Sequence, residues 1–173
     1  MRLIAACVLA CVLVSPAFAE DGYRLDNYRA PTPAALAGAR VIDSGEAQAL
    51  WAAHHAVFVD VLPAVQGAGI HRGQWLPAKP RRDIPGSAWL PNVGAGVLDP
   101  EIESYFRTNL ARLASDGRTS LVFYCLADCW MSWNAAKRAM AWGYTNVIWY
   151  PEGTDGWSQR ELPLDDAIPV PLP

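Results

Sequence analysis

Short apolar runs, separated by polar and turn-forming residues, recur along the middle of the chain. The run at 121–124 is apolar at every position, which is typical of a strand covered on both faces of a sheet. Together the runs have the length and composition of five strands, which we expect at residues 40–43, 56–60, 87–90, 120–124 and 146–150.

Two helices are predicted from their start signals. Asp43 and Glu46 have the spacing of a capping box, which predicts a helix that extends to residue 51. Asp99 followed by Pro100 places an N-cap residue and a first-turn proline in their preferred positions. The apolar stripe of this second helix consists of Ile102, Tyr105, Phe106, Leu110 and Leu113.

A third helix is predicted from the alanine-rich segment 135–142, which Gly143 ends. The helices alternate with the strands along the chain. This alternation indicates an α/β fold built on a parallel sheet.

The first 19 residues have a different pattern. Arg2 lies near the start, residues 3–14 are apolar, and residues 17–19 are a small-residue cleavage signal. No other apolar segment approaches the roughly 20 residues that a membrane-spanning helix needs. We therefore expect a signal peptide at 1–19, secretion to the periplasm, and no membrane span after cleavage.

The rest of the chain divides into an arm, one domain and a tail. Segment 20–38 is polar, bears prolines and contains Tyr-Arg pairs at 23–24 and 28–29. It predicts an extended arm packed on the domain as a surface strap, with partner binding as the alternative. Residues 39–161 are expected to form the domain. The four prolines of 162–173 predict an extended, poorly ordered tail.

Residues 63–85 show no helical or strand period and are rich in glycine and proline, which predicts a long loop. One interpretation of this loop is a solvated basic surface. The other is a cover over a binding site, where its cations attract an anionic ligand. The side chains in question are His71, Arg72, Trp75, Lys79, Arg81 and Arg82.

Composition narrows the classes of function that the protein can have. The 173 residues are 52% hydrophobic and 18% charged, which suits one globular domain. The formal charge of -3 becomes -4 without Arg2, so no basic footprint for nucleic acid is present. Cleavage also removes Cys7 and Cys11, which leaves Cys125 and Cys129 in an oxidising compartment. These two cysteines must pair with each other, bind something together, or stay reactive.

Cys125 and Cys129 lie between a predicted strand and a predicted helix. Ligands bind at this end of the strands in open α/β sheets, and a helix N-terminus lowers the pKa of a nearby thiol. We expect Cys125 to attack and Cys129 to resolve. A structural disulfide is the alternative, although closing so short a loop stabilises a fold by only about 2 kcal/mol.

Other side chains near the thiols are expected to line the site. Asp60 ends the neighbouring strand, where it can accept a proton, bond the cysteine loop, or cap backbone. The charge of Asp128 is expected to raise the pKa of Cys129. Lys137 and Arg138 are expected on a solvated helix face. The lining set is Asp60, Leu126, Ala127, Asp128, Trp130, Met131, Ser132 and Trp133.

No cofactor is predicted, although the two thiols leave other ligands open. Two thiolates suit Cu(I), and a redox cofactor is also open. Covalent haem attachment is disfavoured because Trp130 stands where an axial histidine would follow the cysteine pair. Trp130 and Trp133, three residues apart, form either an aromatic wall beside the thiols or ordinary core packing.

Several segments together resemble the rhodanese-like family over about residues 40–157. The resemblance implies a rhodanese-like α/β fold, an open five-stranded parallel sheet with helices on both faces. The matching segments are the second strand at 56–60, the Ile-Pro-Gly turn at 84–88, Tyr124 and Cys125 before the catalytic loop, and the closing segments 143–147 and 153–157.

The loop from Cys125 to Trp130 also resembles periplasmic proteins named for a CXXCW motif and for association with PQQ-dependent catabolism. That resemblance implies a link to alcohol oxidation. It also implies a periplasmic redox protein as partner, such as a PQQ-dependent dehydrogenase or a cytochrome c.

Two positions depart from the rhodanese pattern. Trp130 stands where an arginine closes the catalytic loop, and Leu62 stands where an arginine often follows the second strand. Without these cations, the bidentate hold on a thiosulfate oxygen is lost, which argues against ordinary thiosulfate sulfurtransferase activity. The leading hypothesis is therefore a periplasmic thiol protein that handles persulfide or disulfide sulfur. The alternative is a non-enzymatic binding or assembly factor for a quinoprotein dehydrogenase, cytochrome or redox cofactor.

Overall fold

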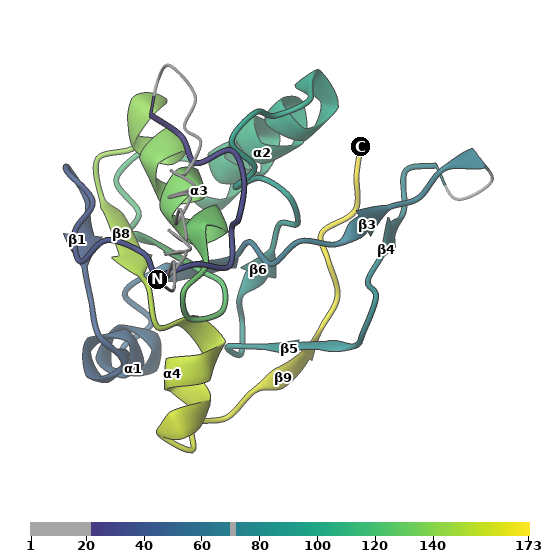
Figure 1. The fold of residues 1–173 in the computed structure, drawn as a ribbon. Helices are drawn as coiled ribbons and strands as arrows, with labels where there is room; N and C mark the ends of the chain where they lie inside the picture. The colour runs from purple at the N-terminus through teal and green to yellow at the C-terminus, as the bar shows by residue number, and fades with distance from the viewer. Residues whose placement is uncertain (1–21, 70–71) are drawn as a thin grey trace, which may run out of the picture.

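A five-stranded parallel sheet forms the centre of the computed structural model, which describes residues 22–69 and 72–173 (Figure 1). The strands stand in the order β1-β8-β7-β2-β6, and every neighbouring pair is parallel. The predicted strands and their parallel arrangement are confirmed, with shorter bounds. They are β1 (Arg40–Val41), β2 (Val57–Asp60), β6 (Ala88–Trp89), β7 (Leu121–Tyr124) and β8 (Val147–Tyr150).

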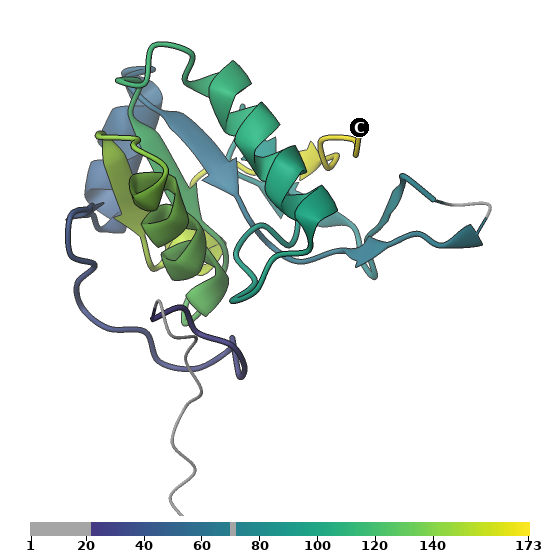
Figure 2. The same cartoon turned by 90° about the horizontal axis from the view of Figure 1, so that it is seen from above.

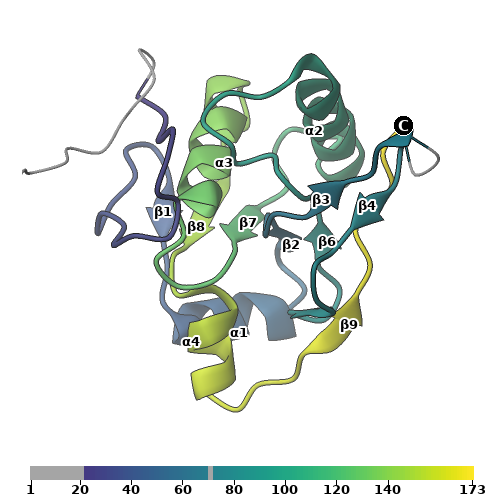
Figure 3. The same cartoon turned by 45° about the vertical axis from the view of Figure 1, so that its right-hand side comes forward.

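Helices cover both faces of this sheet, as expected (Figure 3). Alternate residues of β7 show the division, because Phe123 packs with α2 and α3 whereas Tyr124 packs with α1 and α4. The helices are α1 (Ser44–Ala52), α2 (Pro100–Leu113), α3 (Trp130–Ala141) and α4 (Gly153–Gln159). None of the helices in the described part of the chain is long and apolar enough to cross a membrane.

The starts of α1 and α2 follow the capping signals of the sequence, whereas α4 was not predicted and has no side-chain cap at its start. The capping box of Asp43 and Glu46 is present at α1, and α2 begins at Pro100. The third helix, α3, begins at Trp130 rather than at residue 135, because Cys129 is its N-cap residue. The thiol pair therefore lies directly at the start of a helix.

The segment 63–85, predicted to be a long loop, contains three short strands. Two of them pair as an antiparallel ribbon that projects from the domain, and the third pairs with a strand of the C-terminal tail (Figure 2). Strands of two or three residues are too short to leave a sequence period. The strands are β3 (Val65–Gln66), β4 (Trp75–Leu76), β5 (Arg81–Asp83) and β9 (Asp165–Ala167).

Both ends of the described chain pack on the domain. The tail, for which we expected an extended and poorly ordered segment, packs on the domain: β9 pairs with β5, the Val170 N–H donates to the Trp89 carbonyl, and Leu172 is buried. The arm lies against the start of α3, where the Trp130 N–H donates to the Tyr28 carbonyl. The expected signal peptide at 1–19 and the side chain of His71 lie outside the described residues.

Candidate functional site

The cysteine loop turns sharply at the carboxyl end of β7. Asp128 has a φ of 50°, in the left-handed region, and the Ala127 N–H donates to Asp155 Oδ2 at 3.0 Å. The turn brings Cys125 Sγ and Cys129 Sγ to 2.6 Å from each other, while both remain free thiols. Since a disulfide bond is about 2.03–2.05 Å long, oxidation of this pair needs only a small movement.

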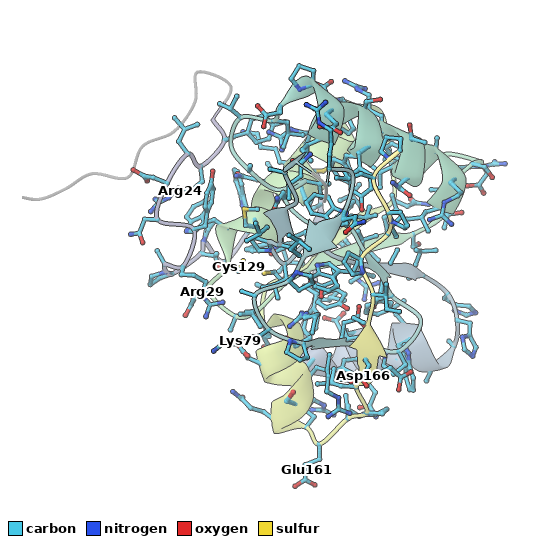
Figure 4. The ribbon with its side chains drawn as sticks, turned by 90° about the vertical axis from the view of Figure 1, so that its right-hand side faces the viewer. Arg24, Arg29, Lys79, Cys129, Glu161 and Asp166 are labelled. Carbon is cyan, nitrogen blue, oxygen red and sulfur yellow. The ribbon has the colours of Figure 1, made fainter. Side chains whose placement is uncertain are left out.

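The N-terminal strap, which we define as residues 23–31, covers Cys129. Arg29 forms an antiparallel bridge with Cys129, and the Trp130 N–H donates to the Tyr28 carbonyl at 2.9 Å. Figure 4 labels Arg29 and Cys129 on this side of the molecule. Cys125 is 0% exposed and Cys129 is 2% exposed. A large partner can therefore reach the sulfur atoms only if this cover moves.

The two thiols have opposite pKa shifts. The contact with the Cys125 thiol lowers the pKa of Cys129 to about 7, and the Met131 N–H at the start of α3 and the Arg29 guanidinium act in the same direction. Burial raises the pKa of Cys125 well above its usual value, and Cys129 and the Asp60 carboxylate add to this rise.

The predicted low thiol pKa is thus found at Cys129 and not at Cys125. Asp128 is exposed, and the net shift of Cys129 is downward, against the upward shift expected from the Asp128 charge. The helix start and the neighbouring thiol together outweigh a carboxylate in solvent.

Asp60 is fully buried at the end of β2, where it pairs in register with Tyr124, the residue before Cys125. It accepts the Leu62 N–H at 2.9 Å and forms a 2.6 Å ion pair with Arg81 Nε. Asp60 therefore caps backbone, as one of its expected roles, and holds a buried cation beside the cysteine loop. Despite this cation, burial raises the pKa of Asp60.

Arg81 also connects to the cysteine loop through Thr154. Its Nη1 donates to Thr154 Oγ1 at 3.2 Å, and the Thr154 N–H donates to the Cys125 carbonyl at 3.0 Å. The cation that Trp130 and Leu62 cannot provide thus comes from the segment 63–85. Of that segment's predicted basic surface, Arg82 and Lys79 are exposed but Arg81 is buried, so the prediction of a wholly solvated surface is wrong.

The remaining lining residues pack the start of α3. The Trp130 and Trp133 rings meet edge to face with centroids 5.3 Å apart, and Trp130 Nε1 donates to the Pro31 carbonyl. Ser132 Oγ donates to the Cys129 carbonyl at 3.0 Å and accepts from Trp149 Nε1 at the same distance. Met131 is buried, and Leu126 and Ala127 are half-buried.

Arg138 is not on a solvated face, contrary to the prediction. It is buried, and it donates to the carbonyl groups of Val93 and Gly96. Lys137 is half-buried and donates to the Gly22 carbonyl. These two cations hold the backbone that surrounds the start of the strap.

Within residues 22–69 and 72–173, no three His, Cys, Asp or Glu side chains gather in a way that could hold a metal ion. In the described part of the site, the two thiols are therefore the only ligands for a metal ion. Its chemistry is that of a close dithiol with one acidic member.

No family model matches the sequence, and no curated protein matches it. Among solved structures, the chain is similar to a thiosulfate sulfurtransferase from Pseudomonas aeruginosa, with 22% identity, a TM-score of 0.50, and coverage of 76% of this chain and 21% of that chain. It is also similar to a variant of EanB in complex with hercynine, with 22% identity, a TM-score of 0.52, and coverage of 75% and 32%. The chain has a rhodanese-like fold.

The rhodanese-like fold confirms the predicted fold class, and at this identity the likeness shows the fold alone. The chain spans about a fifth of the sulfurtransferase and about a third of the EanB variant. The details of the thiol site therefore rest on this chain's own residues.

Two residues of the thiol site, Arg81 and Thr154, were not singled out as site residues from the sequence. One signal for Arg81 was available: Asp60 ends a buried strand, and a buried carboxylate needs a cation or several donors. The nearby segment 63–85 held the candidate cations. Thr154 carried no such signal, because its role depends on how closely α4 approaches the Cys125 carbonyl.

Proposed function

We propose that this rhodanese-like protein exchanges persulfide or disulfide sulfur through Cys125 and Cys129. The observation that supports this proposal is the 2.6 Å separation of two thiols at a helix start. Thiolates, rather than thiols, attack sulfur. Because the pKa of Cys129 is lowered to about 7, Cys129 carries the first thiolate and Cys125 resolves, the reverse of the order expected from the sequence.

With a partner disulfide, the Cys129 thiolate attacks one sulfur and releases the first partner thiolate. Cys125 then loses its proton and attacks the Cys129 sulfur, which releases the second partner thiolate. The two partner thiolates take up the protons that the pair has lost. The pair thus passes two electrons and two protons to the partner and becomes a disulfide.

With a persulfide donor, the Cys129 thiolate takes the outer sulfur and the donor leaves as a thiol. The Cys125 thiolate then attacks the inner sulfur of the new persulfide on Cys129 and expels hydrogen sulfide. The products are one donor thiol, one hydrogen sulfide and the Cys125–Cys129 disulfide. The same pair therefore serves either kind of sulfur partner.

We place this exchange in the periplasm, with a PQQ-dependent dehydrogenase or a cytochrome c as partner. The support is the signal-peptide pattern of residues 1–19 and the likeness of the loop from Cys125 to Trp130 to the CXXCW motif. Deletion of the gene is expected to slow growth on an alcohol that such a dehydrogenase oxidises more than growth on an organic acid. Equal growth defects on both substrates would contradict this partner.

Trapping of a mixed disulfide tests the exchange. Cys125→Ser removes the resolving thiol, so it is expected to accumulate a covalent adduct between Cys129 and the partner, which mass spectrometry identifies. Cys129→Ser is expected to accumulate none. Adducts with Cys129→Ser alone would assign the attack to Cys125, and no adduct with either variant would contradict the exchange.

Burial of both thiols favours a second candidate, a binding or assembly factor that engages its partner through the covered cysteine loop. This candidate predicts stoichiometric binding without turnover. It also predicts that a Cys125→Ser/Cys129→Ser variant binds the partner and rescues the deletion strain. Loss of rescue in a folded variant decides for the thiol chemistry.

A further inference from the structure

Arg81 has one nitrogen for which the fold supplies no acceptor. Its side chain is 8% exposed, Nε bonds to Asp60, and Nη1 bonds to Thr154. Among the residues that the structure describes, Arg81 Nη2 is the one buried side-chain nitrogen or oxygen without a hydrogen-bond partner. Because an unsatisfied buried donor is costly, such a group calls for an explanation in function.

The surroundings of this nitrogen point to the Cys125 sulfur. Thr154 binds both Arg81 and the Cys125 carbonyl, so the guanidinium lies one side chain away from the cysteine backbone. Asp60, which fixes the Nε edge, is the strand neighbour of Tyr124, the residue before Cys125. Burial lowers the pKa of Arg81, but Asp60 and, to a smaller extent, Tyr124 and Cys125 raise it, so the net shift is upward.

Among the described residues, neither of the two carboxyl groups that interact with Arg81 is hydrogen-bonded to its Nη2. Asp60 is already engaged with Nε and with the Leu62 N–H. The Asp83 carboxyl interacts with both Asp60 and Arg81, and burial raises its pKa to about 7. A negative charge forms on the Cys125 sulfur when this thiol ionises, as it must in order to resolve or to leave as a thiolate.

We propose that Arg81 is the anion-stabilising residue of the thiol site, and that its Nη2 donates to the sulfur anion that forms on Cys125. The bound species is a sulfur anion, either the resolving thiolate or the thiolate released when the disulfide is reduced. This inference deepens the proposed exchange and rests on it for its role. A charge-assisted hydrogen bond of this kind stabilises the anion most where water is excluded.

Bonds and electrons balance when the Cys125–Cys129 disulfide is reduced. When a partner thiolate attacks Cys129 of the disulfide, the bond between the two cysteine sulfurs breaks and Cys125 leaves with the electron pair. Arg81 stabilises that charge without giving up a proton. In the opposite direction, the partner thiolate released in the first step takes up the proton of Cys125, and the same nitrogen holds the Cys125 thiolate until it attacks Cys129.

The test uses the Cys129→Ser protein, in which Cys125 is the one thiol left after signal cleavage. Arg81→Lys keeps the positive charge beside Asp60 but lacks the second nitrogen of the fork. It is expected to raise the pKa of Cys125 by about one unit, so that the thiolate fraction at a given pH falls about tenfold. The readout is alkylation rate against pH.

Arg82→Lys is the matched control, because Arg82 follows Arg81 in β5 and its side chain is 61% exposed. It is expected to leave the Cys125 profile unchanged. If Arg81→Lys and Arg82→Lys gave the same dependence of the Cys125 alkylation rate on pH, the proposal would be overturned and the role of Arg81 would be structural. The measurement needs no partner, so a shifted profile without any sulfur exchange would contradict the proposed function and not the role of Arg81.

A second measurement leaves Arg81 intact, in case Arg81→Lys does not fold. The guanidinium nitrogen resonances of Arg81 are followed by NMR while the Cys129→Ser protein is titrated. They are expected to shift with the ionisation of Cys125. In the Cys125→Ser/Cys129→Ser variant, the same titration shows how the ionisation of Asp60, Asp83 and Tyr124 alone shifts the Arg81 resonances. A shift identical to that of the Cys129→Ser protein would overturn the proposal.

Discussion

Cys125 and Cys129 lie in one loop, 2.6 Å apart at sulfur, yet the fold surrounds them differently. Both thiols pack in the larger core cluster, but Cys125 directly follows the central strand β7, and the Asp60 carboxylate adds to the rise of its pKa. Cys129 is the N-cap residue of α3, faces backbone N–H groups, and has Arg29 nearby. Burial alone would raise the pKa of both thiols, so the difference comes from the helix start and from which thiol keeps the shared proton.

The comparison shows that two adjacent thiols suit stepwise sulfur exchange when their pKa values differ. The acidic Cys129 supplies a thiolate near neutral pH, whereas Cys125 holds its proton until the second step. The strap and the Asp60–Arg81 pair each serve one thiol. Each can therefore be changed separately.

The largest expected effect comes from breaking the buried ion pair between Asp60 and Arg81, which lies beside the cysteine loop. Arg81→Met leaves the fully buried Asp60 carboxylate without its cation, which is expected to lower the free energy of unfolding by about 3–5 kcal/mol. Urea unfolding of the reduced protein measures it. Arg82→Met removes an exposed arginine whose nearest carboxylate is 3.7 Å away, and it is expected to cost less than about 1 kcal/mol. Equal losses for the two variants would show that Asp60 does not depend on Arg81.

The next effect tests why Cys129 is acidic. Cys125→Ala removes the neighbouring S–H, so the pKa of Cys129 is expected to rise from about 7 to its usual value of about 8.5 or above. At pH 7 the thiolate fraction, and with it the alkylation rate, should fall more than about tenfold. Cys125→Ser keeps a hydroxyl donor and should show a smaller fall. If alanine and serine act alike, the neighbouring proton does not control Cys129.

A smaller effect concerns the pH dependence of stability in the reduced protein. The folded-state pKa of Cys129 lies below its unfolded value, so its thiolate stabilises the fold at higher pH and this stability is lost as pH falls through about 7. The free energy of unfolding is expected to rise by about 2 kcal/mol between about pH 7 and 8.5.

The difference between the profiles of the reduced wild-type protein and Cys129→Ala isolates this effect. Asp83 acts in the opposite direction below this window: burial raises its pKa to about 7, so stability falls as pH rises from about 4 to 7. Asp83→Asn is therefore expected to remove most of the pH dependence of the free energy of unfolding between about pH 4 and 7, and to leave its rise above pH 7 unchanged. A rise that persists in Cys129→Ala would assign it to another group.

The smallest expected effect loosens the cover of Cys129. The Tyr28 hydroxyl accepts the Gly96 N–H at 2.9 Å, so Tyr28→Phe is expected to weaken the strap by about 1 kcal/mol. Alkylation of Cys129 should then rise about fivefold, while Cys125 stays slow. Tyr144→Phe, on a residue outside the strap, is the control. A faster reaction of Cys125 instead would mean that the strap covers both thiols equally.

The sequence predicted the elements that have a period or a start signal. The apolar runs gave the five strands, and Asp43 and Pro100 marked helix starts that the structure confirms. The predicted start of α3 is five residues late, because the segment 130–134 lacks the alanines that mark the rest of the helix. Propensity alone does not show that Cys129 caps the helix.

The charged network of the site could not be predicted because it depends on distant segments. Arg81, Asp60 and Thr154 come from β5, β2 and α4, and only the folded sheet brings them together. Arg81 and Arg82 are neighbours with the same side chain, yet one is buried and the other exposed because successive residues of a strand point to opposite sides. The sequence placed the cations near the site without showing which one enters it.

The pairing of β5 with β9 also makes the order of synthesis matter. β9 follows every strand of the central sheet in the sequence, so the ribosome makes it after all five are complete. Until Asp165–Ala167 emerges, Arg81–Asp83 lacks the partner strand that fixes its register. A chain truncated before Asp165 is therefore expected to keep both cysteines and the five central strands but to lack the strand that fixes Arg81 beside them.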